Sequence, residues 1–137
     1  MKCAIFGPPY SGKSTLFAAV GGHRPDPGSV GQEHHAVVKV PDPRLDFLTG
    51  LYQPKKTTHA TLELLDLPGF SPNDAHGRDA LTKALPWMRQ CDVLIAVVRD
   101  FESDAVPAYR DRVDAQSDLA ELLEELVYAD LLTTTKR

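Results

Sequence analysis

The sequence lacks most of the marks of secreted, membrane or nucleic-acid-binding proteins. Its two cysteines, Cys3 and Cys91, have no neighbours at metal-ligand spacing, so we expect buried thiols in a reducing compartment. No apolar run approaches the roughly 20 residues that cross a bilayer. The net charge of −4 gives no sign of a strongly basic surface, and we expect no direct DNA binding. The Met-Lys start runs directly into an apolar stretch, which predicts no signal peptide.

What is present is typical of one globular domain. The chain has 137 residues, of which 42% are hydrophobic and 25% charged, enough for a real core. Apolar runs predict strands, of which the last is the clearest buried one, and 3.6-residue periodicity predicts helices between them. The expected strands are 3–6, 34–40, 60–66 and 92–98; the expected helices are 13–20, 44–52, 78–90 and one from Ser117 or Asp118. This alternation predicts an α/β fold with a mostly parallel sheet flanked by helices.

Details of sequence sharpen these boundaries. Gly21 and Gly22 are expected to end the first helix, and Asp42 to cap the second, in which Leu45, Leu48 and Leu51 share one face. The segment 22–33 is rich in glycine and proline and predicts a mobile loop. Strands 34–40 and 60–66 are candidates for an antiparallel pair. Core packing is favoured for the following residues of the last two helices: Leu81, Leu85, Met88, Leu119, Leu122, Leu123, Leu126, Val127 and Leu131.

Residues 7–14, Gly-Pro-Pro-Tyr-Ser-Gly-Lys-Ser, match the phosphate-binding pattern G-x-x-x-x-G-K-[ST]. A strand before the loop and a helix after it would present unpaired backbone N–H groups to a phosphate. The Lys13 ammonium would reach the β- and γ-phosphates, and the Ser14 hydroxyl would bind Mg²⁺. The expected nucleotide-binding residues are Gly7, Pro9, Tyr10, Ser11, Gly12, Lys13, Ser14 and Thr15.

A second motif, Asp66-Leu67-Pro68-Gly69, follows the expected strand 60–66. Beside a phosphate loop, Asp66 would hold Mg²⁺ through a water, and the Gly69 N–H would bond the γ-phosphate and lose that bond on hydrolysis. Taken alone, the pattern is equally typical of an ordinary strand-ending turn. The two motifs together favour Mg²⁺-dependent binding of GTP or ATP, with Lys13 and Gly69 serving hydrolysis.

Several blocks around these motifs resemble the YchF / Obg-like ATPase family of translation-factor-type P-loop GTPases. These blocks are 40–48 (Val-Pro-Asp-Pro-Arg-Leu-Asp-Phe-Leu), 52–58, 60–69, 97–102 and 126–132. The resemblance covers about residues 2–137. It implies a Ras-like G domain, a cytoplasmic location, a ribosome as partner and a hydrophobic residue after D-x-x-G, which is Phe70 here. Such a residue cannot orient water, so slow hydrolysis is expected.

The chain also departs from that family. Ser29 stands in the region where a first-switch Thr is expected, and Ala108 where the family has a His. His76 is an alternative candidate for orienting water, although a loop His is more often a solvated bystander. No N-K-x-D or N-x-x-E motif follows Val98, so we interpret residues 1–137 as the N-terminal part of a G domain that is incomplete at its C-terminus. The base-reading motif, coiled coil and C-terminal domain are not present, and GTP versus ATP stays open.

Two further readings of the same motifs remain open at this stage. One is a non-hydrolysing nucleotide-binding fragment, since the first switch matches loosely. The other is a P-loop kinase, which would need an acceptor site and arginines over the phosphates, whereas the arginines here are scattered. Whether the chain is an enzyme is therefore left open, with nucleoside triphosphate hydrolysis as the leading hypothesis.

Overall fold

The computed structural model describes residues 1–22, 32–71, 75–108 and 110–135; the side chains of residues 75–78 lie outside this description. Ser29 and nearly all of the expected 22–33 loop fall outside the described residues, as does the side chain of His76. The elements run, in chain order, β1 (Lys2–Phe6), α1 (Lys13–Gly21), β2 (His34–Lys39), α2 (Pro43–Tyr52), β3 (Thr61–Asp66), α3 (Ala75–Met88), β4 (Val93–Ala96) and α4 (Ala115–Thr135).

The four strands form one mostly parallel sheet in the order β2-β3-β1-β4. Strand β1 lies between β3 and β4 and is parallel to both, with Ile5 opposite Asp66 on one side and Ile95 on the other. Strand β2 is antiparallel to β3, which confirms the pairing expected from the sequence. The parallel strands end at the same edge, so the loops after β1 and β3 lie side by side.

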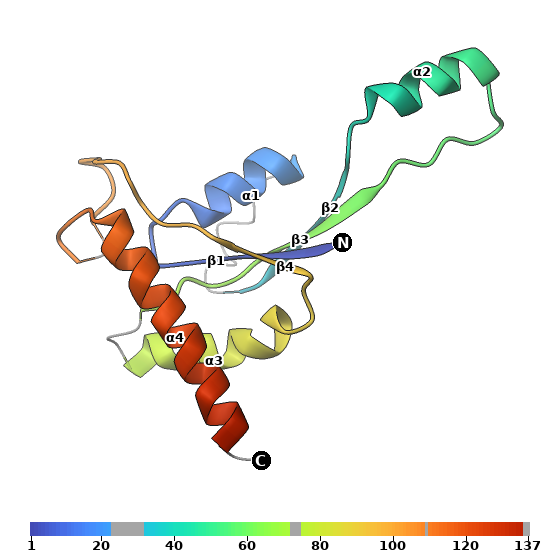
Figure 1. Ribbon diagram of the computed structural model, residues 1–137. Helices are drawn as coiled ribbons and strands as arrows, with labels where there is room; N and C mark the ends of the chain where they lie inside the picture. Colours follow the sequence, from blue (N-terminus) through green and yellow to red (C-terminus); the bar gives the residue numbers. More distant parts are fainter. Residues whose placement is uncertain (23–31, 72–74, 109, 136–137) are drawn as a thin grey trace.

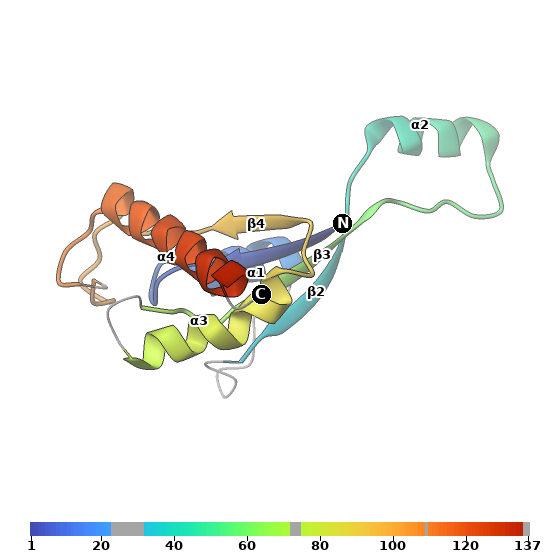
Figure 2. The same ribbon diagram turned by 60° about the horizontal axis from the view of Figure 1, so that its bottom comes forward.

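Helices cover both faces of this sheet (Figures 1 and 2). Alternate residues of a strand point to opposite faces, and β1 is buried on both. Cys3 and Ile5 pack with Phe17 of α1 on one face. Ala4 and Phe6 belong to the larger cluster on the other face, which includes residues of α3 and α4. The α/β architecture expected from the sequence is thus confirmed, with the phosphate loop rising from a strand fixed on both sides.

The first two helices begin and end as the sequence predicts. Helix α1 stops at Gly22, whose N–H bonds the Ala18 carbonyl with φ at 78°. Helix α2 is capped by Asp42, whose carboxylate accepts the Arg44 N–H at 3.0 Å. None of the three leucines of α2 is buried, although Leu45 is partly covered, because this helix stands away from the sheet in both views (Figures 1 and 2).

Strand β4 corrects one expectation. The apolar run 92–98 predicts a strand buried on both faces, but the strand covers Val93–Ala96 and its first two side chains are exposed. In the part of the chain that the structure describes, β4 pairs with β1 alone and forms one edge of the sheet. An apolar run can predict a strand, but whether that strand is buried depends on the elements that pack beside it.

Helices α3 and α4 also differ from expectation. Helix α3 begins three residues earlier than Arg78, and Leu81, Leu85 and Met88 pack into the core as predicted. Helix α4 starts at Ala115 rather than after a Ser117 or Asp118 cap, since the Asp114 carboxylate accepts the Ser117 N–H at 3.0 Å.

Only part of the α4 apolar stripe is buried. Leu122 is in the core and Leu126 packs against it, which confirms the expectation for these two. The prediction of core packing is wrong for four others, which are exposed on another side of the helix: Leu119, Leu123, Val127 and Leu131. These four residues recur every four positions, so they form an exposed apolar stripe beside the buried face of the helix.

Among the described residues, no helix combines the length and apolarity needed to span a membrane.

Candidate phosphate-binding site

The loop after β1 lies directly against the end of β4. Gly7 has a φ of 150°, and a Cβ built on it would meet the Val97 carbonyl oxygen at 2.1 Å. Only glycine fits so close to a neighbouring backbone. At the other end of the loop, Gly12 precedes α1 and provides no side-chain cap. The cap residue therefore offers no acceptor to the first N–H groups of α1, which could bind an anion instead.

Lys13 is buried at the centre of this loop. Its ammonium donates to the Pro8 carbonyl at 2.6 Å. Burial lowers the pKa of Lys13 from 10.5 to about 8, an effect that the nearby Asp66 carboxylate partly opposes. A buried ammonium is costly unless an opposite charge or strong acceptors surround it. A bound anion would therefore stabilise the charged form of Lys13 in this loop.

Ser14 and Asp66 are brought together as the sequence predicts, 52 residues apart in the chain. The Ser14 hydroxyl donates to Asp66 Oδ2 at 2.7 Å. Asp66 is buried, and its Oδ1 has no hydrogen-bond partner among the described residues. A buried carboxylate oxygen without a partner is costly, so a hydrogen-bond donor or a cation at this position would stabilise the site. Ser11 Oγ, in the loop itself, is a second buried polar atom without a partner there.

These oxygens suit Mg²⁺. That ion prefers hard oxygen ligands and is usually held by one or two protein groups together with waters and substrate phosphates. Within the described ranges, no cluster of three or more His, Cys, Asp or Glu side chains offers a site made wholly by protein. The Ser14–Asp66 pair therefore fits an ion that arrives with a nucleotide.

The loop after β3 packs tightly on the phosphate loop. A Cβ on Gly69 would lie 3.0 Å from the backbone of Pro9 and 3.1 Å from Lys13 Nζ. The Phe70 N–H donates to the Gly7 carbonyl at 3.3 Å. Gly69 thus lies where its backbone is next to the predicted γ-phosphate partner, Lys13.

Phe70 is a core residue. Its ring is buried and stacks nearly parallel on Phe6, with ring centroids 6.3 Å apart. The sequence indicated only that Phe70 cannot hydrogen-bond a water. The structure adds that the ring points into the cluster beneath the sheet and anchors the loop there.

The remaining predicted loop residues take different positions. Tyr10 is exposed in a left-handed conformation with φ at 60°, so its backbone rather than its ring belongs to the loop. Thr15 is exposed at the start of α1, and Pro9 is half-buried under Gly69. No direct ligand role follows for these three side chains, and their expected nucleotide contacts stay predictions.

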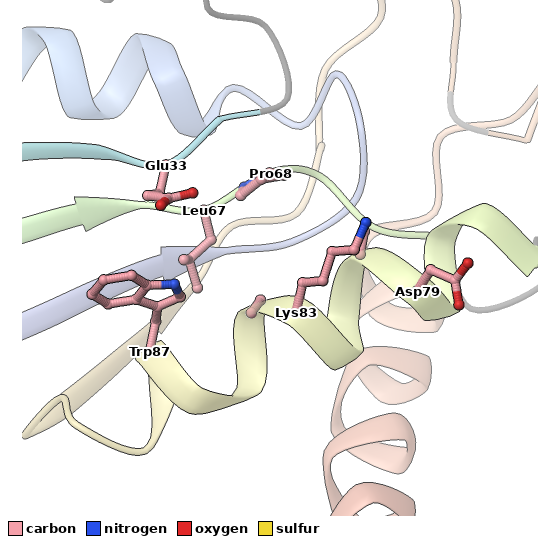
Figure 3. A pocket seen from close by; sticks show the side chains of 8 residues that line it. Glu33, Leu67, Pro68, Asp79, Lys83 and Trp87 are labelled. Carbon is pink, nitrogen blue, oxygen red and sulfur yellow. The ribbon is translucent and has the colours of Figure 1, made fainter.

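A pocket of about 280 Å³ is lined by Leu67 and Pro68 of the D-x-x-G loop, by Glu33 and by residues of α3. Figure 3 shows Trp87 and Lys83 of α3 extending beneath Leu67 and Pro68. The Trp87 ring also meets His35 of β2 edge-on, with centroids 5.7 Å apart. A movement of the loop would therefore change the surroundings of Trp87, the one tryptophan in the chain.

Arg99 is a structural residue that the motif search missed. It is buried, and its guanidinium donates to the carbonyls of Phe101, Val106 and Pro107 at 2.8–3.1 Å while lying 4.8 Å from the Phe101 ring centroid. Arg99 thereby fixes the segment after β4. No sequence pattern marks such a role, because its partners are backbone carbonyls that any residue provides.

Changing the Ser14–Asp66 pair is expected to separate Mg²⁺ binding from nucleotide binding. Asp66→Asn keeps the shape but removes the charge, so the gain in nucleotide affinity on adding Mg²⁺ should fall roughly tenfold to hundredfold. Calorimetric titration with and without Mg²⁺ measures this gain. Asp104→Asn, at an exposed position, is the matched control. An unchanged Mg²⁺ effect in Asp66→Asn would remove Asp66 from the site.

Comparison with known proteins agrees with this geometry. Residues 2–134 match the family described as 50S ribosome-binding GTPase. The "Ribosome-binding ATPase YchF" of Bacillus subtilis (strain 168) is 35% identical over 141 residues, covering 100% of this chain and 38% of the relative. Its counterpart from Haemophilus ducreyi is 34% identical over 134 residues, covering 95% of this chain and 37% of the relative.

A solved structure gives the same result. The Schizosaccharomyces pombe YchF GTPase is 30% identical, with a TM-score of 0.72 over 99% of this chain and 37% of that chain. The chain thus spans less than two-fifths of the length of these relatives. The fold is that of a P-loop GTPase, and the resemblance drawn from the sequence is confirmed. The relatives and the solved structure described above are all YchF proteins. The chain belongs to the 50S ribosome-binding GTPase family.

Proposed function

We propose that the chain binds a Mg²⁺-coordinated purine nucleoside triphosphate, GTP or ATP, and serves its slow hydrolysis as a ribosome-linked switch. The observation that carries this is the buried Lys13 ammonium, which donates to the Pro8 carbonyl and lies near enough to the Asp66 carboxylate for that charge to raise its pKa. Asp66 in turn accepts the Ser14 hydroxyl. A phosphate in this loop would meet the ammonium and the open N–H groups of α1. Mg²⁺ would supply charge neutralisation, held by the Ser14 hydroxyl and by Asp66 through a water.

Slow turnover follows from the D-x-x-G loop. Phosphoryl transfer to water depends on positioning and on neutralising charge. In this proposal Lys13 and the Gly69 N–H would serve the second task, which the closeness of Gly69 to the Lys13 ammonium supports. The Phe70 ring, buried in the core, is not available for the first. Hydrolysis should therefore be slow unless another group or a partner orients the water.

The partner and the location rest on the relatives. The names "Ribosome-binding ATPase YchF" and "50S ribosome-binding GTPase" describe proteins that bind ribosomes and hydrolyse nucleotides. We extend both properties to this chain, together with a cytoplasmic location. One name specifies a GTPase and the other an ATPase, and residues 1–137 contain no N-K-x-D or N-x-x-E motif that would select the base, so the proposal covers both nucleotides.

The two alternatives differ in what they need. A P-loop kinase needs arginines over the phosphates, and the buried Arg99 is instead bound to carbonyls of its own segment. A non-hydrolysing binder needs only the loop, so it differs from the proposed switch in rate alone. Phosphate release distinguishes these two.

Trp87 fluorescence tests the switch, because this ring lines the pocket beneath Leu67 and Pro68. Mg²⁺ with a non-hydrolysable GTP or ATP analogue should change Trp87 emission more than the diphosphate does, since only the triphosphate has the γ-phosphate that would bond the Gly69 N–H. Phosphate release with and without ribosomes then measures turnover. Trp87→Phe is the control that removes the signal. No response to any nucleotide at millimolar concentration, in emission or in phosphate release, would contradict the proposed function.

A further inference from the structure

Helix α2 and its flanking segments project from the sheet as an arm, defined here as residues 40–60. In Figures 1 and 2 the helix stands clear of every other element. None of its residues is buried. Phe47 is 70% exposed and Tyr52 73%, and Leu48 and Leu51 are also exposed. Spacings of one, four and five residues place these four side chains within one broad face of the helix.

The arm is held in shape without packing against the domain. Thr49 and Thr57 share a hydroxyl–hydroxyl hydrogen bond of 3.1 Å, which ties α2 to the segment returning to β3. His59 Nε2, on the same returning segment, lies 4.0 Å from the Asp46 carboxylate of α2. Isolated helices of this length are marginal in water, and helices in proteins owe most of their stability to a packed apolar face. The arm therefore presents a formed helix whose apolar face is covered by no element among the described residues.

The unpaired charges in the segment just after α2 are basic. Arg44 is paired with Asp42 at the start of the helix. Lys55 and Lys56, just after it, are exposed and form no ion pair among the described residues. Two free ammonium groups beside an apolar face suit an apolar surface bordered by carboxylates.

We propose that the arm inserts the Phe47–Tyr52 face of α2 into an apolar, carboxylate-rimmed groove on a protein of the large ribosomal subunit. This rests on the proposed function, which supplies the ribosome as partner. Helix-in-groove recognition uses apolar anchors spaced as these are. RNA would be bound by Lys and Arg along the backbone and by rings that stack on bases, and the two leucines at the centre of this face do neither.

Site-specific crosslinking of the full chain to purified ribosomes tests the occupant. Phe47→p-benzoylphenylalanine should crosslink to a ribosomal protein upon irradiation. The matched control is Val127→p-benzoylphenylalanine, an equally exposed position on α4, which should not give that product. A crosslink from position 47 to ribosomal RNA, or equal protein products from both positions, would overturn the proposal.

Co-sedimentation with ribosomes tests the energetics. The double variant Phe47→Ser, Leu51→Ser should weaken ribosome binding by at least about tenfold and leave nucleotide affinity unchanged, while Val127→Ser should change neither. Undiminished ribosome binding by the double variant overturns this inference and leaves the proposed function intact. A wild-type chain that binds nucleotide but no ribosome overturns it as well. A wild-type chain that binds ribosomes but no nucleotide contradicts the proposed function instead.

Discussion

Lys13→Met is expected to abolish nucleotide binding and, at the same time, to stabilise the nucleotide-free chain. The first effect follows because Lys13 is the buried cation of the phosphate loop, and charge-assisted contacts to phosphate are strong. We expect the affinity for Mg²⁺-nucleotide to fall more than a hundredfold. The second effect follows because burial of the charged ammonium is costly, as its lowered pKa indicates.

The pH dependence gives the sign and size of that cost. The pKa of Lys13 is about 8 in the folded chain, against 10.5 when unfolded. Between these values the unfolded chain binds more protons, so stability rises with pH from about 8 to 10.5. Below pH 8 the penalty is fully present and amounts to about 3 kcal/mol. The lost hydrogen bond to Pro8 offsets about 1 kcal/mol of the gain from Lys13→Met.

Urea denaturation of the nucleotide-free chain from pH 7 to 10.5 measures this. Wild-type stability should rise across that window, while Lys13→Met should lose this part of the rise and be more stable at pH 7. Lys39→Met, at an exposed position on β2, should keep the wild-type slope. If Lys13→Met is less stable than wild type at pH 7, the burial cost assigned to Lys13 is wrong.

Phe70→Gln is expected to destabilise the chain by about 4 kcal/mol and to leave hydrolysis no faster. A Gln at this position would resemble the water-positioning residue of Ras-type enzymes. The Phe70 ring, however, is buried against Phe6, so the substitution removes core packing and buries an amide. Small domains have only about 5–15 kcal/mol to lose.

The control is Phe70→Leu, which keeps an apolar side chain and should cost about 1–2 kcal/mol. Urea denaturation and phosphate release are measured on the same samples. Faster phosphate release from Phe70→Gln at wild-type stability would mean that the side chain at this position leaves the core when nucleotide binds.

The parts of the fold that sequence predicted are those set by local chemistry. The phosphate loop, the Asp42 cap and the glycine end of α1 follow from residues within a few positions of one another. The meeting of Ser14 with Asp66 followed from the two motifs, since each assigned its residue to the same Mg²⁺ ion. These features need no knowledge of distant packing.

The features that sequence missed depend on neighbours. The runs in β4 and α4 are apolar enough for a core, but Val93 and Val127 are exposed because no described element covers them. The sequence also could not show that α2 stands apart, since its leucine spacing is that of a packed helix. The position of the Phe70 ring depends on Phe6, more than 60 residues earlier in the chain.

The central claim is that the Lys13 ammonium binds a phosphate of the nucleotide. Proton uptake on nucleotide binding tests this claim most directly. With a pKa of about 8, about half of the Lys13 side chains are charged at pH 8, and a bound phosphate would charge the rest. Calorimetric titration with Mg²⁺-GTP and Mg²⁺-ATP, in buffers of different ionisation enthalpy, should show one site and an uptake of about half a proton. Lys13→Met should show neither. Failure to bind either nucleotide at millimolar concentration, or equal binding and proton uptake by Lys13→Met, would contradict the claim.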